Sequence, residues 1–162
     1  MQLIGKTLQK SLVGLKIKNR YLYLETQSEE EFCMAQERKF YVCKVCGNIV
    51  GVIQSGGGTL TCCGQPMQEL VANTTDAAQE KHVPVVEQNG SEIVVKVGSV
   101  AHPMLPEHFI GWIYLHTEKG GQRRNLVAGD APEARFAITA DDKVIEAFAY
   151  CNLHGLWKSA SL

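Results

Sequence analysis

The chain has 162 residues and a formal net charge of -1, so it has room for one domain, or for a small one and a medium one. Bulk charge gives no indication of nucleic-acid binding. The apolar content of 45% is ordinary for a globular protein. No apolar run approaches the roughly 20 residues that a membrane span requires, and no secretory signal is recognisable. We therefore expect neither nucleic acid nor a membrane among the partners.

Residues 1–33 differ in composition from the rest of the chain. Residues 1–20 hold five basic side chains and no acidic one, and their apolar residues permit a basic amphipathic helix. Our preferred hypothesis is that residues 1–33 are a translated leader and that Met34 is the natural start, because codons for the glutamates at 29–31 can form a purine-rich ribosome-binding sequence. Mass spectrometry of the native N-terminus tests this, and a chain that begins at Met1 would contradict it. Cys33 has no assigned role.

Two pairs of cysteines lie in residues 37–72. Cys43 and Cys46 form a Cys-x-x-Cys-Gly motif, in which the glycine permits the positive φ of a tight knuckle. Cys62 and Cys63 follow after fifteen intervening residues. Four thiolates in two pairs indicate one tetrahedral metal site rather than a disulfide framework, and the ligands alone permit zinc or iron. Reduced thiolates are typical of a reducing compartment, so we expect a cytoplasmic protein.

The segment around these cysteines is predicted to be a small metal-binding domain, residues 37–72. Residues 39–42 and 49–53 have the composition of short strands, and the glycines at 56–58 predict a turn. So short a segment has too little core to fold alone. We therefore expect the metal to supply much of its folding free energy.

Residues 73–79 are small and polar, which is typical of a linker, and the pattern from residue 80 to residue 162 is β. The predicted strands are 83–86, 92–98, 109–117, 125–128, 134–139 and 144–150, separated by turn signals such as Gly120-Gly121. No stretch of residues 80–162 has a convincing helical period. Short strands at this spacing predict an antiparallel β-sandwich, so the expected fold class is all-β. His116 is in phase with Trp112 and Tyr114 on its strand, and we expect it to have no ligand role.

A second metal site is predicted from the remaining histidines. Cys151 and His154 are three residues apart and can reach one metal ion, but they cannot fill its coordination sphere. His82, His102 and His108 each lie beside a turn or strand signal. Together these residues make a candidate site of four imidazoles and one thiolate.

With both motifs identified, the chain resembles the desulfoferrodoxins, the two-iron form of superoxide reductase. The resemblance covers about residues 37–160 and does not extend to residues 1–33. The matching elements are Cys43-x-x-Cys46-Gly-Asn, Cys62-Cys63-Gly-x-Pro66-Met67, Glu80-Lys81-His82-Val-Pro-Val, Val97-Gly98-Ser99-Val100-x-His102-Pro103-Met104, Gly129-Asp130-Ala131-Pro132 and Cys151-Asn152-Leu153-His154-Gly155.

The resemblance implies a desulforedoxin-like domain followed by an immunoglobulin-like sandwich, each with one iron. The first iron would be held by the four cysteines of residues 37–72. The second would have four equatorial histidines and Cys151 as its axial ligand. Glu80 and Lys81 would lie on the loop over the open sixth position, where Glu80 can bind oxidised iron and Lys81 attracts an anion. The axial thiolate donates electron density to the iron, which favours release of peroxide. The implied reaction is reduction of superoxide to hydrogen peroxide by a homodimer, with electrons from rubredoxin or a similar carrier.

Two other functions are compatible with the sequence. The first is an electron-transfer or redox-sensing iron protein without turnover, which would share both metal sites. The second is a zinc-ribbon binding module, with zinc on the four cysteines. Colour separates the zinc module from the iron proteins, because zinc thiolates are colourless and ferric thiolates are red.

Overall fold

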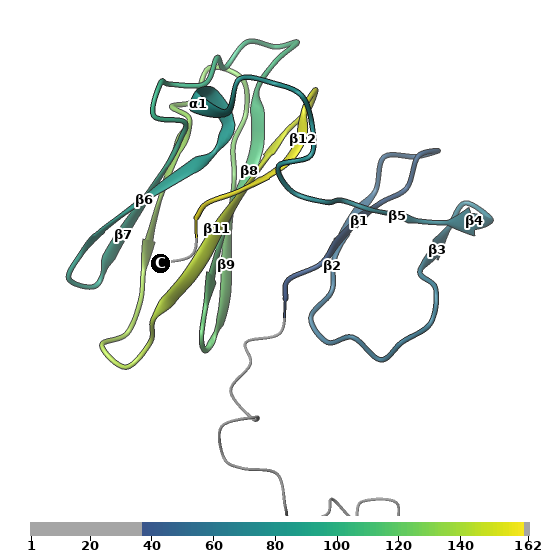
Figure 1. Ribbon diagram of the computed structural model, residues 1–162, viewed down its shortest axis with the longest axis horizontal. Helices are drawn as coiled ribbons and strands as arrows, with labels where there is room; N and C mark the ends of the chain where they lie inside the picture. The colour runs from purple at the N-terminus through teal and green to yellow at the C-terminus, as the bar shows by residue number, and fades with distance from the viewer. Residues whose placement is uncertain (1–36, 161–162) are drawn as a thin grey trace, which may run out of the picture. The chain divides into compact units, whose positions relative to one another are not determined.

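The structure, a computed structural model, describes residues 37–160, and its regular secondary structure is almost entirely β-strand (Figure 1). This confirms the predicted all-β fold class. The structure does not describe residues 1–36, so it does not test the predicted amphipathic helix, the proposed start at Met34 or a role for Cys33. Within residues 37–160, no helix has the length and apolar character needed to cross a membrane.

Residues 37–72 form two small antiparallel sheets around the cysteine pairs. The first has the order β2-β1-β5, from β1 (Phe40–Val42), β2 (Ile49–Gly51) and β5 (Gln68–Glu69). The second is a hairpin of β3 (Thr61–Cys62) and β4 (Gln65–Pro66). A glycine with positive φ follows each cysteine pair, Gly47 at 76° and Gly64 at 77°. Gly47 allows the tight knuckle that the sequence predicted, and Gly64 allows a similar turn after the second pair.

Residues 84–158 form the predicted antiparallel sandwich. One sheet has the order β10-β7-β6, from β6 (Pro84–Asn89), β7 (Glu92–Val97) and β10 (Glu133–Ala137). The other has the order β12-β11-β8-β9, from β8 (Ile110–Thr117), β9 (Gly120–Asn125), β11 (Val144–Cys151) and β12 (Gly155–Lys158). The main core lies between the sheets, where residues such as Val95, Ile113, Ala149 and Trp157 are fully buried.

The four-stranded sheet is apolar on both faces. Alternate residues of β8 and β11 point inward, and the intervening ones, including Trp112 and Phe148, form a second cluster on the outer face. Phe40 of β1 packs into this second cluster, with its ring 5.2 Å from Trp112 and 5.3 Å from Phe148. The outer face therefore packs against the cysteine-bearing segment, which has little core of its own.

One helical turn was not predicted. α1 (Gln79–His82) occupies the end of the expected linker and the start of the expected β region, and it carries the residues proposed for catalysis. A single turn is too short to give a helical period in the sequence, and it is too short to be stable by itself. Its contacts with the rest of the chain decide its conformation.

Several strand assignments were also wrong, and Gly120-Gly121 begins β9 instead of forming the predicted turn. The strand expected at 125–128 does not form beyond Asn125, because the Asp130 carboxylate accepts a 2.8 Å hydrogen bond from the Val127 amide and Gly129 adopts φ 92° in a turn. β12 was missed, because its four residues begin with a glycine and follow a cysteine motif. Pairing with β11 makes this segment a strand.

Replacing Phe40 with alanine should destabilise the protein by about 3 kcal/mol. The substitution would leave a cavity between β1 and the outer face of the sandwich. Urea unfolding of the full chain measures this change. Val50→Ala is the control, because Val50 lies on the neighbouring strand β2 and its side chain is 38% exposed. Equal destabilisation by the two substitutions would contradict the packing role of Phe40.

Candidate metal centres

The structure brings the four predicted cysteines together. The Sγ atoms of Cys46 and Cys62 are 3.6 Å apart, those of Cys62 and Cys63 are 3.9 Å apart, and the sulfur atoms of all four, Cys43 included, lie within 4.8 Å of one another. We call this set the tetrathiolate centre. Cys43 is buried, whereas Cys46 and Cys63 are exposed. One side of the tetrathiolate centre is therefore open to solvent.

Backbone hydrogen bonds close the loop at Cys43, the first cysteine of the tetrathiolate centre, and lower the pKa of its thiol. The Cys43 amide donates to Asn48 O at 2.8 Å and the Gly47 amide donates to Cys43 O at 2.9 Å, which closes the knuckle. The N–H groups of Cys46 and Val45 lower the pKa of Cys43 to about 6, so this thiol ionises readily. Hydrogen bonds with neighbouring sulfurs, first that of Cys46, raise the pKa of Cys63 to about 12. Binding of a metal cation to the cluster therefore displaces protons.

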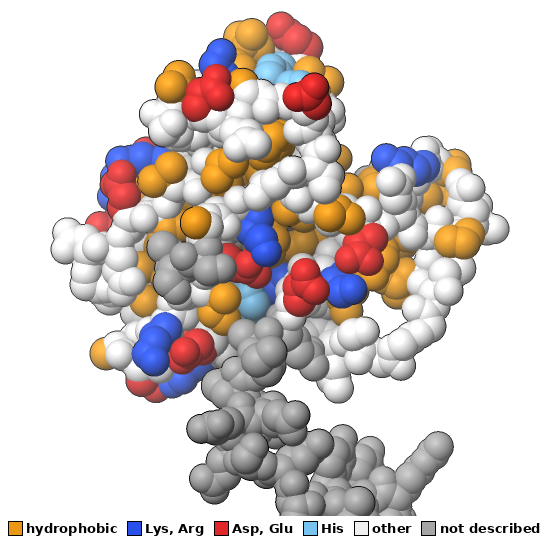
Figure 2. All heavy atoms as spheres, in the orientation of Figure 1, with side chains coloured by type: hydrophobic (Ala, Val, Ile, Leu, Met, Phe, Trp, Pro, Cys, Tyr) orange, Lys and Arg blue, Asp and Glu red, His pale blue; other side chains and the backbone are white. Residues whose placement is uncertain are grey.

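The second cluster collects residues from four separate segments at the α1 end of the sandwich. His82 ends α1, His102 and His108 flank a short turn after β7, Cys151 ends β11, and His154 lies in the β11–β12 turn. Their ligand atoms lie within 4.8 Å of one another. We call this set the histidine–cysteine centre. Figure 2 shows histidine side chains reaching the surface at this end, with charged side chains beside them.

Hydrogen bonds define which imidazole atoms face the middle of the histidine–cysteine centre. His82 Nδ1 donates to Ala78 O at 2.7 Å, so its Nε2 carries a lone pair. His102 Nδ1 contacts Pro103 O at 2.5 Å. The buried Nε2 atoms of His102 and His108 have no hydrogen-bond partner among the described residues. His154 presents Nδ1, which is 2.9 Å from His82 Nε2 and 3.5 Å from Cys151 Sγ.

Burial favours the neutral form of three of these imidazoles, those of His82, His102 and His108. Desolvation lowers the pKa of His82 and of His108, and it lowers that of His102 to about 4. Desolvation also raises the pKa of Cys151. Converging lone pairs and unpartnered buried nitrogens are unfavourable in an apolar interior unless a cation binds them. The donor set therefore fits one metal ion with nitrogen ligands and one thiolate.

Two residues that support the centre were not singled out from the sequence. The Asn152 side chain accepts from the Phe109 amide and donates to Glu107 O, both at 2.9 Å, so it ties the His108 segment to the β11–β12 turn. Trp157 is fully buried and its ring stacks on His82 at 4.7 Å. Neither residue type is a usual metal ligand, and only the fold places them beside the ligands.

Glu80 and Lys81 are exposed residues of α1 next to His82. Burial is the main cause of the lowered pKa of His108, and the positive charge of Lys81 lowers it further. The charge of Glu80 raises the pKa of His82, against the larger effect of burial. Both side chains are thus close enough to the histidine–cysteine centre to influence it.

His116 lies outside both clusters, as the sequence predicted. Its Nδ1 atom is 3.2 Å from a carboxylate oxygen of the buried Glu146. The imidazole therefore has a polar partner on the same face of the four-stranded sheet as Trp112 and Phe148.

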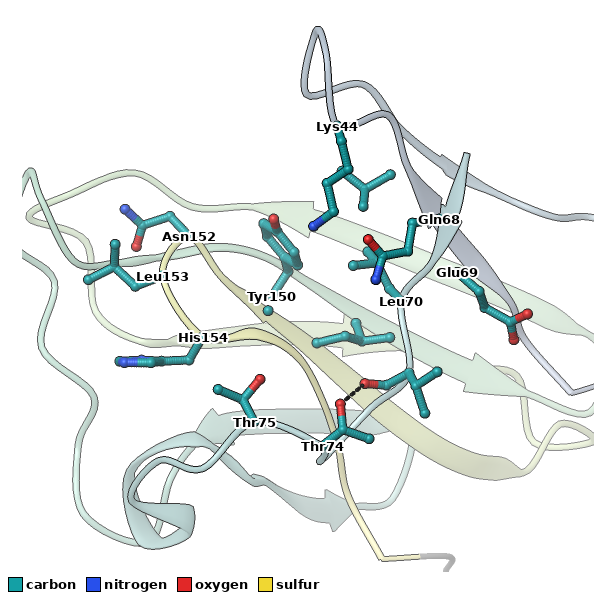
Figure 3. Close-up of a pocket in the computed structure, with 14 residues that line it drawn as sticks. Lys44, Gln68, Glu69, Leu70, Thr74, Thr75, Tyr150, Asn152, Leu153 and His154 are labelled. Carbon is teal, nitrogen blue, oxygen red and sulfur yellow. Dashed lines mark hydrogen bonds between the residues drawn. The ribbon is translucent and has the colours of Figure 1, made fainter. Parts of the chain in front are cut away.

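A cleft of about 360 Å³ borders both metal-binding loops. Lys44, between Cys43 and Cys46, lines it from one side, and Asn152 lines it from the other. Figure 3 shows the Lys44 ammonium pointing into the cleft and the His154 ring pointing away from it. The knuckle of the tetrathiolate centre thus faces the back of the turn that holds His154.

These observations define an all-β protein with two separate metal-binding sites, one of four thiolates and one of imidazoles and a thiolate. Comparison with known proteins identifies its family. Residues 35–70 match the family described as "Desulfoferrodoxin, N-terminal domain" and residues 74–160 match "Desulfoferrodoxin". The desulfoferrodoxin of Syntrophotalea carbinolica is 55% identical over 127 residues, which cover 78% of this chain and 98% of that protein. The superoxide reductase of Pyrococcus horikoshii is 39% identical over 98 residues, covering 49% of this chain and 84% of that one.

Among solved structures, the superoxide reductase from Treponema pallidum matches with a TM-score of 0.67 and 46% identity, over 77% of this chain and 100% of that one. The chain belongs to the desulfoferrodoxin family. It accordingly has two mononuclear iron sites, the tetrathiolate centre and the histidine–cysteine centre. Iron rather than zinc thus follows from the family.

Replacing Asn152 with leucine should lower the iron affinity of the histidine–cysteine centre about 10- to 100-fold, because residues that orient ligands commonly have effects of this size. The substitution leaves the Phe109 amide and Glu107 O unpartnered and frees the His108 segment. Competition with a chelator measures the affinity. Leu153→Ala is the control, since Leu153 occupies the same turn and is 60% exposed. Equal affinities in the two variants would show that Asn152 does not support the centre.

Proposed function

We propose that the protein is a superoxide reductase, which combines superoxide with one electron and two protons to give hydrogen peroxide. The observation that carries the proposal is the histidine–cysteine centre with the exposed cation Lys81 beside it. Four imidazoles and one thiolate leave one position of a six-coordinate metal for a small ligand. The names of the Pyrococcus and Treponema proteins support the same activity.

The residues of the histidine–cysteine centre have distinct parts in this proposal. The four histidines bind the iron through neutral imidazoles, and Cys151 binds it through a thiolate. When bound, the iron supplies the electron that reduces superoxide. In this proposal Lys81 attracts the anionic substrate, and the Glu80 carboxylate would be a ligand for the oxidised iron. Because both side chains are exposed, water can deliver protons beside them.

The tetrathiolate centre is proposed to relay electrons or to stabilise an assembly. Its solvent-exposed thiols and the cleft that it shares with the His154 turn support contact with an electron carrier. We propose a rubredoxin-like protein as the carrier and a homodimer as the assembly. A cytoplasmic location is proposed because five cysteines of the described chain are free.

The alternative is an electron-transfer or redox-sensing protein with the same two irons. Stopped-flow mixing of the reduced protein with superoxide distinguishes the two functions. A superoxide reductase should consume superoxide at a rate near the diffusion limit and should turn over when a reductant is present. Slow or absent second-order consumption of superoxide by the reduced protein would favour the alternative.

Cys151→Ser should abolish turnover or release iron from the histidine–cysteine centre, because a serine oxygen is a harder and less electron-releasing ligand than a thiolate. Iron analysis and superoxide consumption are the measurements. Cys46→Ser is the matched control: it should lose the red colour of the tetrathiolate centre and keep superoxide consumption. Wild-type activity of Cys151→Ser with its iron retained would remove Cys151 from the ligand set.

Lys81→Ala should slow the reaction with superoxide about tenfold and leave the iron spectrum unchanged. A unit charge several ångströms from the substrate site is worth about 1 to 2 kcal/mol after screening. The wild-type rate should fall as salt rises, and that of the variant should fall less. Lys143→Ala is the control. Lys143 precedes β11 and Cys151 ends it, so the rise of an extended strand puts the two residues roughly 25 Å apart. Identical rates and salt dependence for wild type and Lys81→Ala would place the attraction elsewhere.

A further inference from the structure

The short helix α1 is held in place by hydrogen bonds from the turn that follows β7. Its own backbone hydrogen bonds are few: the Lys81 amide donates to Ala78 O at 3.1 Å and the Val83 amide donates to Gln79 O at 2.9 Å. One helical turn with unsatisfied terminal carbonyls is not stable in isolation. The position of α1 must therefore come from its neighbours.

Residues 98–100 provide three hydrogen bonds to this segment. The Val100 amide donates to Glu80 O at 2.9 Å, and the Ser99 hydroxyl donates to the same oxygen at 3.3 Å. The Gly98 amide donates to Val83 O at 3.1 Å. The carbonyl of Glu80, which α1 itself leaves free, is thus bound by the 98–100 turn.

Gly98 makes this close approach possible. Its φ is 84°, and a Cβ atom at this position would lie 2.7 Å from Glu80 O, 2.7 Å from Lys81 O and 2.4 Å from Val100 O. All three are backbone oxygens, so no side-chain rotation can relieve the contacts. Any side chain at residue 98 would push α1 away from the turn.

We propose that the 98–100 turn is a positioning element that sets the place of Glu80 and Lys81 beside the histidine–cysteine centre. The same segment continues into His102, so one stretch of backbone carries one ligand and fixes the helix that carries another, His82. The effect on substrate attraction rests on the proposed function. The effect on the backbone of α1 does not.

The test compares Gly98→Ala with Gly90→Ala in the iron-loaded full chain. Gly90 lies in the turn at the other end of β7 and also has positive φ (61°), but a Cβ atom there would meet nothing within 4 Å beyond its chain neighbours. The control therefore introduces similar backbone strain without the contact. Hydrogen exchange should become at least tenfold faster at the Lys81 and Val100 amides in Gly98→Ala and should stay unchanged there in Gly90→Ala. Equal exchange in the two variants would overturn the proposal.

Superoxide kinetics provide the second measurement. Gly98→Ala should lose most of the salt dependence that Lys81 confers, and the double variant with Lys81→Ala should be no slower than the slower single variant, since both changes remove one effect. Additive losses would show that the turn does not act through Lys81. If the wild type itself does not consume superoxide, the proposed function fails and hydrogen exchange still decides the positioning role.

Ser99→Ala covers the case in which Gly98→Ala does not fold. It removes only the hydroxyl that donates to Glu80 O and introduces no contact. Exchange at the Lys81 amide should be about two- to fivefold faster than in the wild type, because the lost hydrogen bond contributes about 0.5 to 1 kcal/mol. An unchanged rate in a folded Ser99→Ala would overturn the proposal.

Discussion

Convergence of four imidazoles and one thiol at one end of the sandwich, with His82, His102 and Cys151 buried, is the constraint on which the rest of the structure depends. Desolvation lowers the pKa of His82 and of His102, and the buried Nε2 atoms of His102 and His108 have no hydrogen-bond partner among the described residues. Such an arrangement is stable only with a cation in place. The surrounding residues, including Asn152 and Trp157, hold the rings in the orientation that this cation requires.

The two metal centres differ in burial, and this difference matches their proposed roles. Cys46 and Cys63 are exposed, so a protein carrier can approach the tetrathiolate centre closely. His82, His102 and Cys151 are buried, and the exposed residues of α1 lie beside them, where we propose that a small anion approaches.

Packing on the outer face of the four-stranded sheet joins the cysteine-bearing segment to the sandwich. Phe40 packs against Trp112, Tyr114 and Phe148, so the small segment gains apolar contacts that its own strands of two or three residues cannot supply. Its folding therefore depends on two sources, the metal and this aromatic cluster.

The sequence by itself determined the fold class, the strands of strong β composition and the residues of both clusters. Alternating patterns and ligand spacing are local properties, and Cys43-x-x-Cys46 or Cys151-x-x-His154 can be recognised without the fold. Tertiary structure alone decided the conformation of α1, the pairing of β12 and the turn at 127–130. These segments are too short to specify their own conformation, and Gly98, Asn152 and Trp157 acquire their roles only through contacts with residues distant in the chain.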